Sequence, residues 1–306
     1  YKRLIDNTKH VFISFVSSEN SQISRFANEL FDRKINLATN DETYKDILYK
    51  NNFISYNSEV IEEEIDLTKI SWSASSLKKF LDCRKKFYLE NILKIKNHSI
   101  SLLPENFELG SVIHKILEEL IRSGEKNVEK IDELFLQYKK TNPFLILDLE
   151  VFREKIYNFL EFEKQRLNIK NIDLEIKFTT NFNRISINGI IDRVDLNEDT
   201  YELIDYKTSK NLNVDTEKTY EKSHDFQLEF YYIAAKELYK AQNVKAYYFS
   251  LYDNLLIEEL VLDKKLEILS SIFSELKELS KEKIKFMKTE NKSVCEFCNF
   301  KVICNR

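Results

Sequence analysis

Four cysteines constrain the folding of this 306-residue chain more than any other feature of its sequence. Cys83 stands alone, and the other three close the C-terminus as C-x2-C-x5-C, at Cys295, Cys298 and Cys304. If all four thiols bind one centre, they hold two distant parts of the chain together around residues 84–294. Closing so long a loop would restrict the unfolded chain by about 5 kcal/mol in free energy. The sequence therefore indicates a fold in which the C-terminal segment returns to the region of Cys83.

The residues themselves leave the nature of such a centre open. Four thiolates would suit zinc or an iron–sulfur cluster. Zinc sites usually show two local pairs of ligands, and a division into one and three is unusual for zinc. The remaining alternative is that the cysteines are small, buried apolar side chains without any ligand.

The composition is typical of a globular protein, since 43% of the residues are hydrophobic and 32% are charged. The charges nearly cancel to a net charge of −4, so a nucleic-acid partner would have to contact a local basic patch. No apolar run approaches the ~20 residues that cross a bilayer, and no secretory signal is visible. We therefore expect a cytoplasmic protein with no membrane partner, whose cysteines are free or metal-bound in the reducing cytosol.

Hydrophobic periodicity predicts an alternation of helices and strands. We expect helices over residues 23–31, 73–93, 111–122, 128–140, 148–167, 225–240 and 264–288. We expect strands over residues 10–16, 172–180, 184–196, 201–208, 244–252 and 255–262. Short links, NFN and NEDT, predict that the three middle strands are antiparallel neighbours. This order indicates an α/β fold of the mixed α+β type, with a domain boundary near residues 60–70.

Two carboxylates and a lysine stand at the ends of neighbouring predicted strands. Strand alternation places Asp205 and Lys207 on one face, and Asp192 ends the preceding strand. Carboxylates that converge on one point repel each other unless a cation joins them, and hard oxygen ligands favour magnesium or manganese. Taken alone this spacing is weak, because charged residues are common in the chain and a solvated strand end would look the same.

Four motifs in order make the pattern specific. They are Gly110-Ser-Val-Ile-His114, then G-x-x-D-R-x-D from Gly189 to Asp195, then D-Y-K-T from Asp205 to Thr208, and finally Q-L-x-x-Y from Gln227 to Tyr231. Together they resemble the PD-(D/E)xK nuclease superfamily, in the branch that contains the RecB and AddB nuclease domains. The resemblance implies a restriction-endonuclease-like core, in which helices flank a central mixed sheet, and a Mg²⁺- or Mn²⁺-dependent deoxyribonuclease activity.

The resemblance also implies a role for each motif residue. His114, Asp192, Asp205 and the carbonyl of Tyr206 would bind the metal ion, and Lys207 would be the catalytic lysine. Gln227 and Tyr231 would orient the DNA phosphate or support the site. Arg193 and Asp195 would make structural contacts near it. Glu175, on the first of the three strands, is a weaker candidate that we set aside as a surface residue.

The four cysteines are similar to those that hold a [4Fe-4S] cluster in AddB-type nucleases and in CRISPR-associated adaptation nucleases. The segment before Cys83 fits that pattern, although those families commonly place proline after the cysteine and Arg84 stands there in this chain. The resemblance therefore implies an iron–sulfur cluster that joins the two ends of the nuclease domain. The basic segment Arg84, Lys85 and Lys86 could contact DNA phosphates, and a solvated helix face is the equal alternative.

Residues 10–30 resemble the end of the helicase-like region of AddB. We therefore expect residues 1–65 to be the tail of such a domain or a linker, and residues 66–306 to be the nuclease domain. The chain begins at Tyr1 without an initiator methionine, which predicts a piece of a longer AddB-like subunit. Its partners would be a single-stranded DNA end and an AddA-like helicase–nuclease that processes double-strand breaks. The alternatives are a stand-alone CRISPR-adaptation exonuclease and a catalytically dead DNA-binding or assembly module.

Overall fold

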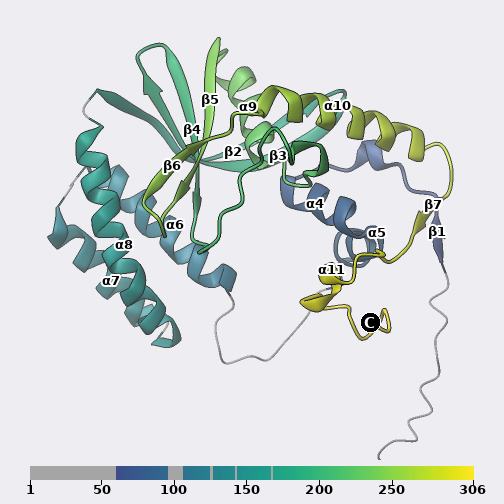
Figure 1. Ribbon diagram of the computed structural model, residues 1–306, viewed down its shortest axis with the longest axis horizontal. Coiled ribbons are helices and arrows are strands. Elements are labelled where there is room, and N and C mark those ends of the chain that lie inside the picture. Colours follow the sequence, from purple (N-terminus) through teal and green to yellow (C-terminus); the bar gives the residue numbers. More distant parts are fainter. Residues whose placement is uncertain (1–59, 96–105, 125–126, 142, 167) are drawn as a thin grey trace, which may run out of the picture. The chain divides into compact units, whose positions relative to one another are not determined.

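The computed structural model describes residues 60–95, 106–124, 127–141, 143–166 and 168–306 (Figure 1). The strand expected over residues 10–16 and the helix over 23–31 lie outside the described residues. The predicted division near residue 65 stays a prediction. None of the described helices is both long enough and apolar enough to cross a membrane.

A five-stranded mixed sheet forms the centre of the fold (Figure 1). The strands lie in chain order: β2 (Ile169–Phe182), β3 (Ile185–Asn197), β4 (Thr200–Lys207), β5 (Asn243–Ser250) and β6 (Leu255–Glu258). As predicted from the short links, β2, β3 and β4 pair antiparallel, and β5 and β6 do so as well. Only β4 and β5 are parallel, and the connection between them contains α9 (Gln227–Leu238).

Helices cover both faces of this sheet (Figure 1). One apolar cluster joins one face to α4 (Ala74–Asp82), α9 and α10 (Leu262–Leu279), and a second cluster joins the other face to α6 (Asn106–Ser123), α7 (Val128–Thr141) and α8 (Ile146–Gln165). Along β4, Leu203 belongs to the first cluster and Ile204 and Tyr206 to the second. This alternation is what a strand buried on both faces requires. It confirms the predicted mixed fold with flanking helices.

The helix expected over residues 73–93 is interrupted at Cys83. Ser73 caps α4 through a reciprocal pair of hydrogen bonds with Ser76. Cys83 then adopts an extended backbone (φ −162°, ψ 105°), and α5 (Arg84–Phe87) and a π-helical turn (Tyr88–Ile92) follow. The break turns the chain at the cysteine, which helix periodicity alone could not reveal.

The helix expected over residues 264–288 is also shorter than predicted. α10 ends at Leu279, and β7 (Ile284–Phe286) pairs with β1 (Ile61–Glu63) in a small second sheet. Ile284 and Phe286 are buried while Lys285 between them is exposed, which is the two-residue period of a strand. A last short helix, α11 (Ser293–Glu296), leads into the cysteine-containing tail.

Trp72 anchors the start of α4 to the central sheet. Its backbone forms a bridge to β3: the Trp72 N–H donates to Ser186 O (2.9 Å), and the Asn188 N–H donates to Trp72 O (2.8 Å). The indole is fully buried and stacks on Phe87, with ring centroids 4.9 Å apart. The N-terminus of α4 is therefore held beside the part of β3 that precedes Asp192.

A buried lysine fastens α10 to α9. Lys265 is 1% exposed, and its Nζ lies 3.3 Å from Glu229 on α9, 3.3 Å from Glu259 and 3.2 Å from Asp215. Burial raises the pKa of Glu229 to about 7, and the charge of Lys265 opposes that rise. These contacts set the position of α9, which carries Gln227 and Tyr231.

Gly189 is required by the packing of β2 against β3. A Cβ at this position would lie 2.8 Å from Cζ of Phe178, whereas a Cβ at Gly110 would meet only Thr208 Oγ1 at 3.6 Å. We predict that Gly189→Ala destabilises the domain by about 1–3 kcal/mol, because the buried ring has to move. Gly110→Ala is the matched control and should be neutral or stabilising by up to about 1 kcal/mol, since it lies in a helix.

Urea unfolding of the two variants measures both effects. Combining Gly189→Ala with Phe178→Leu should recover part of the loss, since the smaller side chain leaves room for the methyl group. Additive losses in the double variant would contradict this account.

Candidate functional site

The candidate site lies where β3 and β4 separate. The two strands pair as far as Arg193 and Ile204, and the next residue on each strand is a buried carboxylate, Asp192 or Asp205. Asp192 Oδ2 accepts a hydrogen bond from the backbone N–H of Tyr206 at 2.9 Å. The Asp192 side chain thus accepts the hydrogen bond that a backbone carbonyl of β3 would accept in a continuous ladder. The two strands separate at this fork, with Asp192 and Asp205 on its two sides.

Asp205 is a buried carboxylate with a raised proton affinity. Burial raises the pKa of Asp205 to about 6, and the negative charge of Asp192 adds to the rise. Asp205 is 1% exposed. Two acidic groups held this close in a poorly solvated place favour a bound cation.

His114 reaches this fork from α6. Its Nε2 lies 3.0 Å from the carbonyl oxygen of Tyr206, and its Nδ1 lies 3.4 Å from Asp192 Oδ2. Burial would lower the pKa of His114, but the hydrogen bond and charge of Asp192 outweigh it and raise the pKa to about 9. Three of the predicted ligands, the imidazole of His114, the carboxylate of Asp192 and the Tyr206 carbonyl, are therefore adjacent.

Glu175 belongs to the site, and the expectation that it is a surface residue is wrong. It lies on β2 between residues that pair with Arg193 and Ile191 of β3, so it stands opposite Asp192. Its φ is +51°, which is unusual for a residue other than glycine. Burial raises the pKa of Glu175 to about 7, and the charge of Asp192 adds to this.

The ligand atoms of His114, Glu175 and Asp192 all lie within 4.8 Å of one another. Among the described residues, this is the group of histidine, cysteine and acidic side chains gathered closely enough to hold a metal ion. Asp205 is not in that group, although it was a predicted ligand. Glu175 could have been found from the sequence only if the strand register had been known, because that register places it opposite Asp192.

A closed ring of polar contacts holds Asp205 instead. Lys207 Nζ lies 2.7 Å from Asp205 Oδ2 and donates to Gln227 Oε1 at 2.7 Å. Gln227 Nε2 donates to Tyr231 Oη at 3.0 Å, and that hydroxyl donates to Asp205 Oδ1 at 3.1 Å. Burial opposes the charge of Lys207, but the Asp205 carboxylate outweighs it and raises the pKa of the lysine. The seven predicted site residues thus come together, and their catalytic roles stay predictions.

Comparison with known proteins identifies the family. A family model described as the PD-(D/E)XK nuclease superfamily matches residues 71–305. The chain belongs to this superfamily. The match covers the four motifs, the sheet and all four cysteines.

Solved structures and curated proteins add little to this assignment. A structure named "Putative exonuclease", from Eubacterium rectale, is 12% identical with a TM-score of 0.49, and the match covers 77% of this chain and 87% of that one. A structure named SSO0001 is 16% identical with a TM-score of 0.31, over 81% of this chain and 89% of that one. No curated protein matches the chain.

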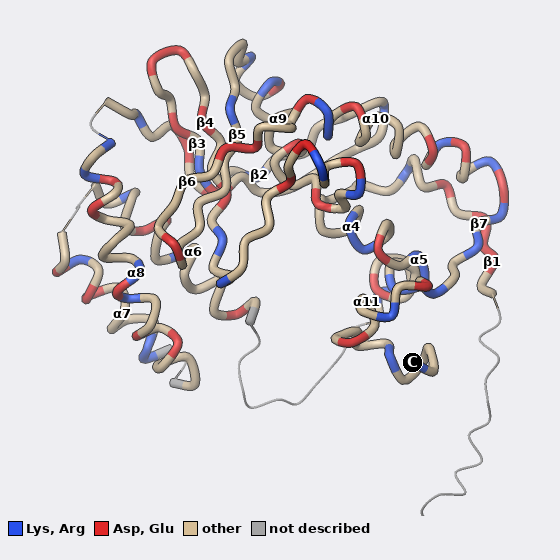
Figure 2. The backbone as a smooth tube through the Cα atoms, in the orientation of Figure 1, with Lys and Arg blue, Asp and Glu red and all other residues tan. Residues whose placement is uncertain are grey.

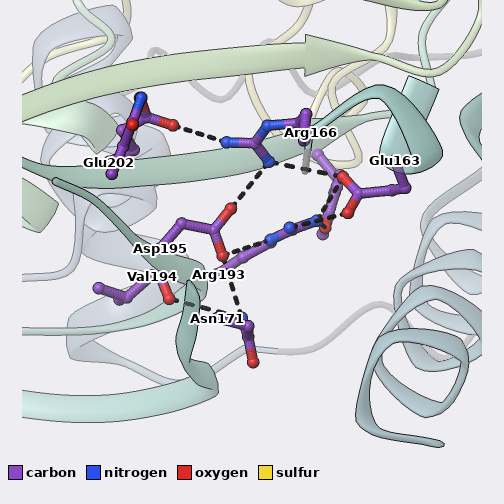
Figure 3. A network of polar contacts seen from close by, with 9 residues as sticks. Glu163, Arg166, Asn171, Arg193, Val194, Asp195 and Glu202 are labelled. Carbon is purple, nitrogen blue, oxygen red and sulfur yellow. Dashed lines mark hydrogen bonds and ion pairs between the residues drawn. The ribbon is translucent and has the colours of Figure 1, made fainter. Parts of the chain in front are cut away.

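Behind the site, the PD-(D/E)XK domain contains a buried network of charges (Figure 3). Arg193, 3% exposed, binds both carboxylate oxygens of Glu163 on α8, at 2.8 and 3.0 Å. It also donates to Asp195 Oδ1 at 2.8 Å and to the Tyr206 hydroxyl at 3.3 Å. Because the backbone of Tyr206 contacts both Asp192 and His114, this arginine supports the site through one residue.

Arg166 extends the network to the far end of the sheet (Figure 3). It donates to Asp195 Oδ2 at 2.8 Å and to Glu202 Oε2 at 2.6 Å. Asn171 on β2 donates a further hydrogen bond from its Nδ2 to Asp195 Oδ1 at 3.1 Å. The network therefore fastens the end of α8 to β2, β3 and β4, which agrees with the structural contacts expected for Arg193 and Asp195.

The four cysteines converge on a second place. All of them line one small cavity, together with Lys86, Lys288 and Phe300. Burial raises the pKa of Cys304, Lys85 lowers it, and the other three thiols raise it further.

The predicted DNA-binding segment is largely occupied by internal contacts. Arg84 pairs with Glu275 at 3.1 Å and lies over the ring of Phe80. Lys85 is buried, and Lys86 lines the cysteine cavity. Figure 2 shows basic residues in α5 and in the C-terminal tail. The segment therefore offers Lys86, rather than all three cations, to a partner.

We predict that Arg193→Met destabilises the domain by about 3–5 kcal/mol, because it removes one of the two arginines that balance the buried carboxylates of Glu163 and Asp195. Lys281→Met, which breaks the exposed pair with Glu278, is the control and should change stability by less than about 1 kcal/mol. Chemical denaturation measures both values. A small loss in Arg193→Met would show that the network does not hold the sheet and α8 together.

Proposed function

We propose that this chain is a divalent-metal-dependent nuclease that hydrolyses phosphodiester bonds at single-stranded DNA ends. The observation that carries the proposal is the group of His114, Glu175 and Asp192 beside the Asp205–Lys207 pair. Membership of the nuclease superfamily supports the reaction class.

The donor set fits Mg²⁺ or Mn²⁺. Carboxylate and carbonyl oxygens are the ligands these ions prefer, and burial together with the charge of Asp192 raises the pKa of both Glu175 and Asp205. Asp192, His114, Asp205 and the Tyr206 carbonyl would hold the ion, and Glu175 adds a ligand that the motifs did not indicate. A bound ion would polarise the phosphodiester and lower the pKa of a water molecule.

The residues of the chain supply the rest of the chemistry. The raised pKa of Lys207 keeps its ammonium group protonated. The Gln227 side chain accepts a hydrogen bond from this group and holds it beside Asp205, where the ammonium group can donate to a phosphate oxygen. Tyr231 fixes the Asp205 carboxylate and receives the Gln227 amide, so α9 orients both groups. His114 would hold a metal ion as the neutral imidazole, so it would have to be deprotonated in the metal-bound protein.

The cysteines would hold a [4Fe-4S] cluster with a structural role. They lie in one cavity and come from the end of α4 and the C-terminal tail, so a cluster would join these two segments. The one-plus-three pattern of the cysteines favours a cluster over zinc. Arg84, where proline is common after this cysteine, continues directly into α5 and leaves the thiol in place.

We propose further that the domain is the C-terminal part of a cytoplasmic AddB-like subunit that works with an AddA-like helicase–nuclease in double-strand-break repair. The resemblance of the motifs supports this, and residues 1–59, where the helicase-like tail is expected, lie outside the described part. A CRISPR-adaptation exonuclease with the same cysteine pattern is the alternative. A dead DNA-binding module is disfavoured, because the metal group and Lys207 are both intact.

We predict that Asp205→Asn and Lys207→Ala reduce Mg²⁺-dependent cleavage of single-stranded DNA by at least about 10²–10³-fold, since each removes charge that the transition state needs. Lys245→Ala, which removes an exposed lysine from β5, should leave the rate unchanged. Circular dichroism should show a native fold in all three. Full activity in Asp205→Asn or Lys207→Ala would refute the site.

We predict that Cys83→Ser or Cys298→Ser abolishes visible absorbance of the anaerobically purified protein and lowers its melting temperature. Without one of its four thiolates the cluster would no longer join Cys83 to the C-terminal tail, so the constraint on the unfolded chain would be lost. Ser293→Ala, an exposed substitution in the same tail, is the control and should keep both colour and stability. Unchanged colour and melting in the cysteine variants would rule out the cluster.

A further inference from the structure

The active-site cavity extends well beyond the metal group. Its volume is ≈ 410 Å³, which lies within the range of ~300–1,000 Å³ that small-molecule sites occupy. His114, Glu175 and Asp192 line one part of it, and residues at the start of α4 line another: Ser73, Ala74, Ser75 and Lys78. The cavity therefore has room for a nucleotide unit in addition to a metal ion and one phosphate.

The α4 wall is built into the fold. The bridge between Trp72 and β3 places Ser73 beside Asn188, and the capping bonds with Ser76 fix the first turn. Lys78 follows Ser75 by three residues, so the two share one face of the helix. These side chains therefore present a fixed surface to the cavity, and they lie outside the four motifs that run from Gly110 to Tyr231.

Charge makes Lys78 the distinctive residue of this wall. Among the described residues that line the cavity, it is the one lysine or arginine, against the carboxylates of Glu175, Asp192 and Asp225. Lys78 Nζ lies 3.1 Å from Asp225 Oδ2, and the two side chains are 48% and 40% exposed. So exposed a pair contributes little free energy, and an anion can compete for the lysine.

Two hydroxyls and an apolar floor complete the wall. Ser73 Oγ and Ser75 Oγ lie 3.0 Å apart, so one donates to the other and the second keeps a proton to donate. Ile190, which is 41% exposed, and the rings of Phe178 and Phe230 lie among the lining residues. A nucleotide has the chemistry that suits this cavity, because its phosphate could contact Lys78 while its sugar and base pack against the apolar side chains.

We propose that Lys78, with the hydroxyls of Ser73 and Ser75, binds the phosphate next to the one that is cleaved. The inference rests on the proposed nuclease function and adds a second subsite to it. Because this phosphate does not react, its contact acts equally on the bound substrate and on the transition state. The subsite therefore sets how tightly and in which register the strand binds, and leaves the chemical step unchanged.

Steady-state kinetics on a single-stranded oligonucleotide test this role. Lys78→Gln should raise KM about tenfold with kcat within about twofold, as expected for one charged phosphate contact. Lys69→Gln, which removes an 83%-exposed lysine paired with Asp66 outside the cavity, is the matched control and should change neither value. An unchanged KM in Lys78→Gln, or an equal rise in the control, would overturn the subsite.

A chemical substitution in the DNA locates the contact. Oligonucleotides in which one linkage is a neutral methylphosphonate, placed on either side of the cleaved linkage, should bind about tenfold more weakly to the wild type at one position only. In Lys78→Gln the same oligonucleotide should show no further loss, since the partner is already absent. Equal losses in both proteins at every position would overturn the proposal.

Direct binding separates this inference from the nuclease function. In the Lys207→Ala background with Mg²⁺, Lys78→Gln should reduce the slope of log K against log salt by about 0.7, the value for one phosphate on a single strand. Binding with this change but no cleavage by any variant would refute the nuclease and keep the subsite. Cleavage without any change in slope would keep the nuclease and refute the subsite, and absence of binding would refute both.

Discussion

Two like charges buried at a fork in the sheet dominate this structure. Asp192 and Asp205 follow the last paired residues of β3 and β4, and almost no water reaches either carboxylate. Neighbouring groups offset their repulsion, since the Tyr206 N–H and His114 contact Asp192 while Lys207 and Tyr231 contact Asp205. A metal ion would complete this compensation, since burial and the charge of Asp192 raise the pKa of both Glu175 and Asp205.

Two structural connections link this fork to the rest of the domain. Tyr206 joins the site to the buried network, because its backbone contacts Asp192 and His114 while its hydroxyl contacts Arg193. α4 joins the cavity to the cysteine centre, since it begins at Ser73 beside β3 and ends at Cys83. A nine-residue helix is about 13 Å long and stiff, so a constraint at the cysteines also restrains the cavity wall.

Much of the fold and of the candidate site could be predicted from the sequence. The sheet strands, the antiparallel order of the first three and the helices on both sides followed from periodicity and short links. Motif residues such as His114 and Lys207 were found because their spacing is specific. Glu175 was missed because its importance depends on strand register, which places it opposite Asp192. The helix break at Cys83 and the strand β7 were missed because each depends on a partner distant in sequence.

The sequence by itself determined the superfamily, the identity of the chemical groups and the order of the elements, because local periodicity and motif spacing are properties of neighbouring residues. Only the tertiary structure decided which groups meet. The fork between β3 and β4 brings Glu175 into the metal group, the α4 wall gives Lys78 a place in the cavity, and internal pairing occupies Arg84. The physical reason is that charge pairing and burial act through space, and one residue's shift in strand register would change every one of these neighbours.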